Sequence, residues 1–165
     1  MPSTSSPIAA FLPSAASRDL NLYLDALWSR HFADVARLNA IQIAYGASWK
    51  RRLGLIRLSA DMTISFIGIN ALLSLPEVPE YVLVTTIAHE LVHYSHGFGS
   101  PLLRRYDHPH ANRAVERELE CRELASYLHC CNQWIDNEWY TFYDKLRVSG
   151  WKHACEAHHP EQAPA

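Results

Sequence analysis

Residues 81–93 form an almost unbroken apolar segment that ends in two histidines four positions apart. Apolar side chains recur at the three- and four-residue spacing of a helix face, at Val84, Ile87, Ala88 and Leu91. Pro79 stands where a helix can begin, since the backbone N–H group that proline lacks would have no helical hydrogen-bond partner in the first turn. The segment therefore predicts one long buried helix, around which the rest of the chain has to pack.

The two histidines belong to the sequence His89-Glu90-Leu91-Val92-His93. Residues four apart lie on one face of a helix, so His89 and His93 can both reach one metal ion. Glu90 can then sit beside the metal and accept a proton from bound water. The spacing predicts a Zn²⁺ site with Glu90 as catalytic base; the competing interpretation of Glu90 is a surface glutamate paired with a helix neighbour.

A catalytic zinc ion usually takes three protein ligands, so a third must follow the helix. A loop is predicted first, from Gly97, Gly99 and Pro101. Behind it, His108 and His110 precede a helical segment that starts at Ala111. We favour His110 as the ligand, because the helix holds its backbone, whereas His108 precedes a proline and is biased toward extended geometry.

Other residues compete for the third ligand position. His96 follows His93 by three residues, and it would extend alongside the first two ligands rather than close a tetrahedral site. The next helix offers glutamates, which serve as ligands in other zinc peptidases, at Glu116, Glu118 and Glu120. The donor for a tetrahedral intermediate is left open among Tyr94, His96, Arg104, Arg105, Tyr106 and the unused member of His108 and His110.

The remaining patterns predict an α+β fold. From Ser17, a possible helix cap, apolar residues recur at helical spacing as far as Leu38, which indicates an amphipathic helix of about twenty residues. Short β-branched or alternating runs predict a small antiparallel sheet from residues 40–45, 55–58 and 62–69. Two further helices are expected behind the metal helix, from Ala111 to about Asn132 and from Trp134 to Leu146.

Length and composition favour one domain over residues 17–155, because 165 residues with 48% hydrophobic content can bury a sizeable core. Residues 1–16 and 156–165 are rich in Pro and Ala and are expected to be flexible termini. Since no apolar run approaches about 18 residues and no secretory pattern opens the chain, we expect a cytoplasmic protein without membrane association. The four cysteines form no Cys-x-x-Cys pair and are expected to be reduced.

The order of these elements, with the strand Gly54-Leu55-Ile56-Arg57-Leu58 and the helix carrying His89-Glu90-x-x-His93, resembles a SprT-like zinc metallopeptidase domain, the class of Spartan-type proteases. The resemblance covers roughly residues 20–130. It implies a zincin-like fold, zinc ligands at His89 and His93, and Glu90 as the base. It also implies association with DNA, which the net charge of -2 does not support independently.

We therefore expect a zinc-dependent endopeptidase that hydrolyses peptide bonds in protein or peptide substrates. Its site residues would be Glu90 as base and His89, His93 and His110 as ligands of Zn²⁺. The alternative is a zinc-bearing module that binds a partner without cutting it. A third interpretation makes the motif a coincidence within a helical core. The sequence predicts neither the substrate nor the oligomeric state.

Overall fold

The structure, a computed structural model, describes residues 18–149. Its main elements are α1 (Leu20–His31), β1 (Ala40–Tyr45), β2 (Gly54–Leu58), β3 (Ile64–Ile69), α2 (Glu80–Ser95), α3 (Ala114–Cys121), α4 (Ala125–Trp134) and α5 (Tyr140–Val148). The predicted α+β class is confirmed. The termini predicted to be flexible, residues 1–16 and 156–165, lie outside the described residues.

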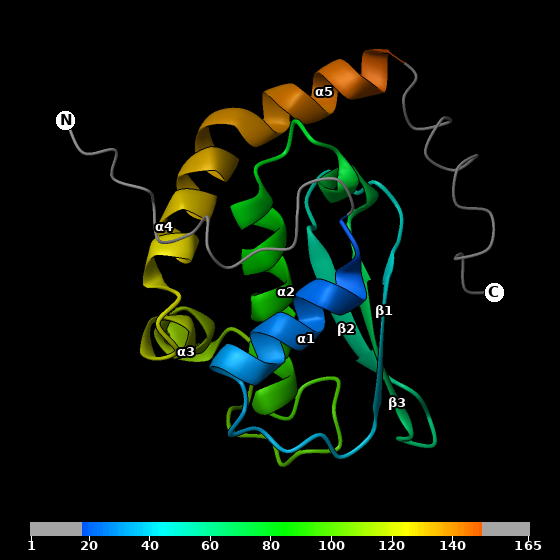
Figure 1. Ribbon diagram of the computed structural model, residues 1–165, viewed down its shortest axis with the longest axis vertical. Coiled ribbons are helices and arrows are strands. Elements are labelled where there is room, and N and C mark those ends of the chain that lie inside the picture. Colours follow the sequence, from blue (N-terminus) through cyan, green and yellow to red (C-terminus); the bar gives the residue numbers. More distant parts are fainter. Residues whose placement is uncertain (1–17, 150–165) are drawn as a thin grey trace.

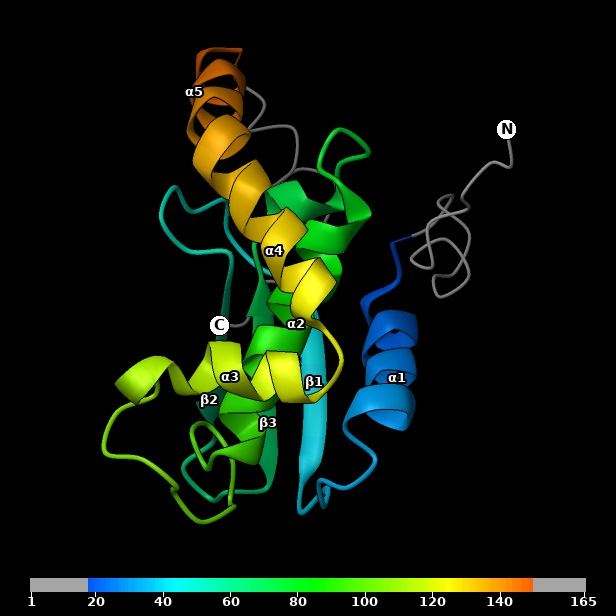
Figure 2. The same cartoon turned by 90° about the vertical axis from the view of Figure 1, so that its left-hand side faces the viewer.

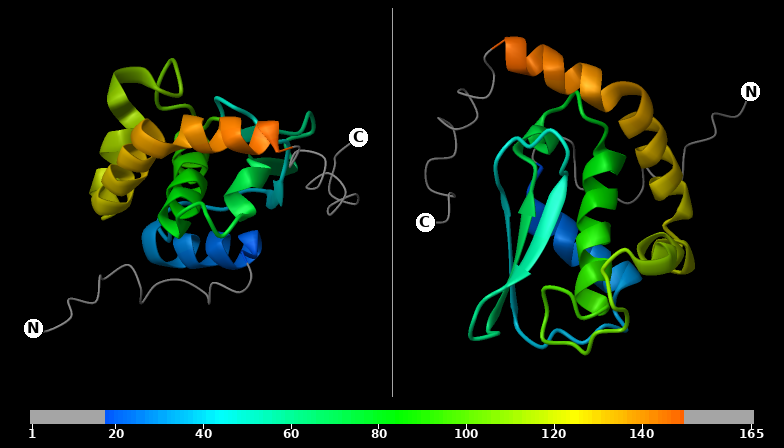
Figure 3. Two further views of the ribbon diagram at one scale, coloured as in Figure 1. Left: turned by 90° about the horizontal axis from the view of Figure 1, so that it is seen from above. Right: turned by 180° about the vertical axis from the view of Figure 1, so that it is seen from behind.

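The helix α2 is the centre of the molecule (Figure 1). It contacts α1, α3, α4 and the strands β2 and β3. Seen from the side, α1 covers one side of α2, and α3, α4 and α5 curve around the other (Figure 2). The views from above and behind show the sheet standing beside α2, with α5 crossing over the top (Figure 3). Thirteen of the sixteen residues of α2 are buried, as the apolar pattern predicted.

The three strands form a mixed sheet of order β1-β3-β2, so the prediction of an antiparallel sheet is wrong for one of its two pairings. β2 and β3 form an antiparallel hairpin, in which Leu55 pairs with Gly68. β1 instead runs parallel to β3, with Ile43 opposite Ile67. Residues 46–53 connect β1 to β2, and β3 later pairs between these two strands. β2 is therefore an edge strand of the sheet, and it contacts α2.

α1 is shorter than predicted, because it ends at His31 and not near Leu38. Ser17 lies outside the described residues, and the cap is Asp19, whose carboxylate accepts a hydrogen bond from the backbone N–H of Asn21 at 2.9 Å. At the other end Phe32 is fully buried, which turns the chain into the core. Tertiary partners thus override the continuing apolar periodicity.

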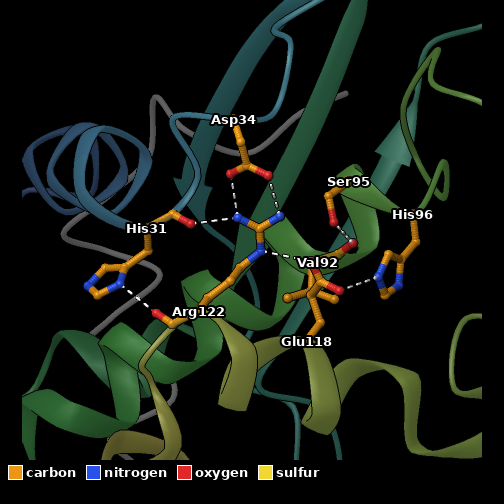
Figure 4. Close-up of polar contacts among 7 residues, drawn as sticks. All are labelled: His31, Asp34, Val92, Ser95, His96, Glu118 and Arg122. Carbon is orange, nitrogen blue, oxygen red and sulfur yellow. Dashed lines mark hydrogen bonds and ion pairs between the residues drawn. The ribbon is translucent and has the colours of Figure 1, made fainter.

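The end of α1 is held by Arg122, at the end of α3 (Figure 4). Its guanidinium donates to the carbonyl oxygen of His31 at 2.6 Å and to the carboxylate of Asp34 at 2.7 Å. The ring of His31 donates back to the carbonyl of Arg122 at 2.7 Å. Arg122 also donates to Glu118 at 2.9 Å, so one side chain joins α1 to α3. We call these four residues the Arg122 clamp.

The predicted helix from Ala111 to Asn132 is interrupted, and this prediction is wrong in two places. A short 3-10 turn, η2 (Ala111–Arg113), precedes α3. A second break follows α3, where Glu123 takes a left-handed conformation with φ 63° and turns the buried Leu124 into the core. The expected boundary at Trp134 is absent, because α4 continues through a π-helical turn (Ile135–Trp139) into α5.

Candidate metal centre

Three histidines converge on one side of α2. The ligating atoms of His89, His93 and His110 all lie within 4.8 Å of one another, and the structure thus brings together the three residues predicted as ligands. The Nε2 atoms of His89 and His93 are 3.0 Å apart, one helical turn from each other. The ring of His110 lies 4.8 Å from that of His93 and 5.3 Å from that of His89, measured between centroids.

The loop after α2 brings His110 back to the helix. Gly97 and Gly99 have φ of 81° and 68°, which only glycine adopts without strain. At Gly97 a Cβ would come within 2.5 Å of the backbone of Leu103, so the loop packs tightly on itself. The N–H of Phe98 donates to the carbonyl of His93 at 2.9 Å, and the N–H of Arg105 donates to that of His96 at 3.0 Å.

The two helix histidines are held in their neutral form. Burial, together with the nearby His110, lowers the pKa of His89 to about 4. Burial also lowers the pKa of His93 to about 3, with His89 and His110 contributing. Neutral imidazole is the form that binds a metal ion, so neither histidine would have to lose a proton to bind one at neutral pH.

Glu90 lies beside the histidines and is 4% exposed. Burial raises the pKa of its carboxyl group to about 8, against the lowering effect of the positive charge on Arg52. The backbone of Gly54, at the start of β2, is packed directly against this carboxyl group, since a Cβ there would lie 2.8 Å from Glu90 Oε1. The interpretation of Glu90 as a surface glutamate is therefore wrong.

The competing ligand candidates are placed elsewhere. His96 is fully buried, and its Nε2 lies 3.4 Å from the carboxylate of Glu118 (Figure 4). Glu118 is itself bound by Arg122, and neither residue joins the histidine group. His108 and Glu120 are exposed and also lie outside the group. Among these glutamates, Glu116 lines the same cavity as His89 and raises the pKa of His89 through its charge, but it does not join the histidine group.

A cavity of about 390 Å³ opens beside His89, Glu90 and His110. It lies between α2, α3, α4 and the segment before β2, and its other lining residues are Arg51, Arg52, Leu53, Gly54, Thr85, Thr86, Val115, Glu116, Leu119, Leu128, Cys131, Asn132 and Ile135. Its size falls in the range of about 300–1,000 Å³ usual for ligand sites. The sequence did not reveal Gly54 or the α4 residues as parts of this site, since only the tertiary fold brings them to it.

The pKa shifts predict how the metal-free protein responds to acid. Folding lowers the pKa of His89 from 6.5 to about 4 and that of His93 from 6.5 to about 3. The two neutral imidazoles therefore contribute fully to the free energy of unfolding above pH 6.5, and this contribution is lost as the pH falls toward the folded-state pKa values. Glu90 acts oppositely, since its raised pKa favours the folded state at lower pH. We expect urea unfolding of the chelated Glu90→Gln variant to show a steeper loss of stability below pH 6.5 than the wild type. Equal slopes in both proteins would contradict these shifts.

Gly54→Ala is expected to displace the Glu90 carboxyl group, because the added methyl would lie 2.8 Å from Oε1 and 2.9 Å from Thr86 Cγ2. Any activity that depends on Glu90 should fall on the order of 10–100-fold, since small misplacements of a catalytic group are costly. The control is Gly46→Ala, which meets only the ring of Trp49, at 2.9 Å, and does not line the cavity. Turnover would be measured beside urea stability, and wild-type turnover in Gly54→Ala would refute the contact's role.

Within the described residues, no helix is both long and apolar enough to cross a bilayer. No family model matches the chain, and no curated protein matches its sequence. The function therefore has to be argued from the geometry of the three histidines, Glu90 and the cavity beside them.

Proposed function

We propose that the protein is a zinc-dependent metallopeptidase with a SprT-like, zincin-like domain. The observation that carries this proposal is the convergence of His89, His93 and His110 beside the buried carboxyl group of Glu90, with His89, Glu90 and His110 lining one cavity. A histidine cluster by itself would support metal binding only. The adjacent carboxyl group adds the proton acceptor that hydrolysis requires.

The residues present fit a zinc ion. Two ligand nitrogens of one zinc ion, each about 2.0–2.1 Å from the metal, lie roughly 3–4 Å apart. The observed 3.0 Å between the Nε2 atoms of His89 and His93 agrees with this separation, and His110 lies within 4.8 Å. Three imidazoles suit zinc better than calcium or magnesium, which prefer oxygen ligands.

Zinc bound by three histidines supplies a Lewis acid and lowers the pKa of water toward neutrality. The chain's own contribution is to place a proton acceptor there. Glu90 Oε1 is confined by Gly54 and shielded from solvent, which fixes where the carboxyl group can take up and return a proton. Burial raises the pKa of Glu90 to about 8 in the metal-free protein, and the positive charges of Arg52 and of a bound zinc ion would favour the ionised form, which is the form that accepts a proton.

The surroundings of the site suit an extended peptide. β2 forms one edge of the sheet and begins at Gly54, which lines the cavity. An edge strand offers backbone N–H and C=O groups to a further strand, so a peptide substrate can pair with it. This arrangement favours protein or peptide substrates over small molecules.

The test is metal-dependent cleavage by the full chain. The purified protein is stripped with a chelator, supplied with one equivalent of zinc or of magnesium, and incubated with an unfolded protein and a peptide mixture, with cleavage read by mass spectrometry. We expect cleavage with zinc only. Cleavage that survives chelation would overturn the proposal, while tight zinc binding without cleavage would favour the alternative of a zinc-bearing binding module.

A further inference from the structure

The cavity extends from Glu90 between α3 and α4, beyond the residues needed to hold a metal. Four aliphatic side chains line this part, namely Val115, Leu119, Leu128 and Ile135. Val115 and Leu119 are buried on the α3 side, and Leu128 and Ile135 are half-buried on the α4 side. Apolar surface in an open cavity gains free energy when an apolar group covers it and removes it from water.

Cys131 also lines the cavity and is 3% exposed. Burial raises the pKa of its thiol to about 12, so the group stays protonated at neutral pH. A protonated, buried thiol behaves as a small hydrophobic group and not as a nucleophile or a metal ligand. Cys131 therefore adds to the apolar surface of the cavity.

Two arginines, Arg51 and Arg52, line the cavity at the segment before β2. Both are exposed, and neither forms an ion pair with another residue of the described chain. Their neighbour Lys50, by contrast, is paired with Asp144 at 3.1 Å. Arg52 acts through its charge on the carboxyl group of Glu90, but neither arginine is held in an ion pair with another described residue. Their positive charges at the side of the cavity attract an anionic group on a ligand that enters it.

We propose that this cavity selects peptide segments in which a large aliphatic or aromatic residue stands next to an acidic one. The apolar side chain fills the space between α3 and α4, and the neighbouring carboxylate faces Arg51 and Arg52. This inference rests on the proposed function for the peptide nature of the ligand. Glu116, on α3, also lines the cavity and disfavours an anion on that wall, so the arginine side sets the preference for charge.

Binding tests this preference separately from cleavage. The probes are hexapeptides with blocked ends that carry Leu-Asp or Asp-Leu between alanines, with matched peptides in which Leu is replaced by Ala or Asp by Lys. Binding of each peptide to the zinc-loaded Glu90→Gln protein is measured by calorimetry. This variant is used because it is expected not to cleave the peptides. We expect replacement of Leu by Ala to weaken binding at least about tenfold in either the Leu-Asp or the Asp-Leu peptide, as burial of such a side chain predicts. Replacement of Asp by Lys should weaken binding as well, and more at low salt.

Three protein variants, each built on Glu90→Gln, locate the effect. Ile135→Arg places a charge in the apolar part and should abolish the preference for Leu over Ala. Arg51→Glu with Arg52→Glu should reverse the preference for Asp over Lys, and both positions are exposed, which keeps the fold intact. The matched control is Met62→Arg, which is 49% exposed and does not line the cavity.

Equal binding of the Leu and Ala peptides, or no binding of any probe, would overturn the inference. So would an unchanged preference in both the Ile135→Arg and the double arginine variant. The proposed function is judged on a different result, the zinc-dependent cleavage of the same peptides by the wild type. Selective binding without cleavage would therefore overturn the peptidase and leave the cavity's preference standing.

Discussion

Glu90→Gln is expected to lower zinc-dependent peptide cleavage by about 10²–10⁴-fold, the usual contribution of a general base. Glutamine has nearly the same shape and fits beside Gly54, so the buried position is kept while the proton acceptor is removed. Glu90 does not belong to the group of three histidines that could hold a metal ion, so the zinc content of the variant should equal that of the wild type. The measurements are kcat for a peptide substrate and the zinc content of the purified protein.

Glu116→Gln is the matched control for this prediction. It removes a carboxylate from another wall of the same cavity, and it is expected to change turnover far less than Glu90→Gln. If Glu90→Gln retained wild-type kcat with zinc bound, Glu90 would not be the base. If it lost both zinc and activity, the loss could not be assigned to proton transfer, and Glu90→Asp would then be compared for zinc content.

His110→Ala is expected to weaken zinc binding more than about 100-fold, since even the loss of a residue behind a ligand costs about 10–100-fold. Removing His110 leaves only the two histidines of α2 from the cluster. A pair of ligands on one helix cannot complete the usual three-ligand site. The dissociation constant is measured by competition with a fluorescent zinc chelator, and activity should fall in parallel.

His108→Ala provides the control, because it removes an imidazole from the same loop, two residues earlier, without touching the cluster. This variant should bind zinc as the wild type does. Wild-type affinity in His110→Ala, or a larger loss in His108→Ala than in His110→Ala, would refute the assignment of the third ligand.

Local sequence patterns predicted the parts of the site that lie on one element. His89, Glu90 and His93 belong to a single helix, whose apolar spacing and proline start are visible without any tertiary information. His110, favoured as the third ligand, lies in the same cluster, because a loop that ends at a helix restricts where the chain can return; its role as a ligand stays a prediction. The contact between Gly54 and Glu90 could not be predicted, since it joins segments that only the packed fold brings together.

The errors in the fold have the same origin. The spacing of apolar residues continued past His31, where contacts with Arg122 hold the end of the helix, and across Glu123, where a left-handed residue ends α3 and buries Leu124. The parallel pairing of β1 with β3 could not be predicted either, because the residues that favour a strand are the same for parallel and antiparallel pairing. Periodicity therefore located the elements, and side chains far away in the sequence decided where they stop and how they pair.

The Arg122 clamp has a consequence for the order in which the molecule assembles. It joins positions 88 and 91 residues apart in the chain, and loops of that length close slowly because of the entropy they lose. Glu118, a member of the clamp, also faces His96 at the end of α2. The contacts behind the end of α2 are thus completed only when the first helix of the chain has docked, so we expect zinc capture by the proposed site to be a late event in folding.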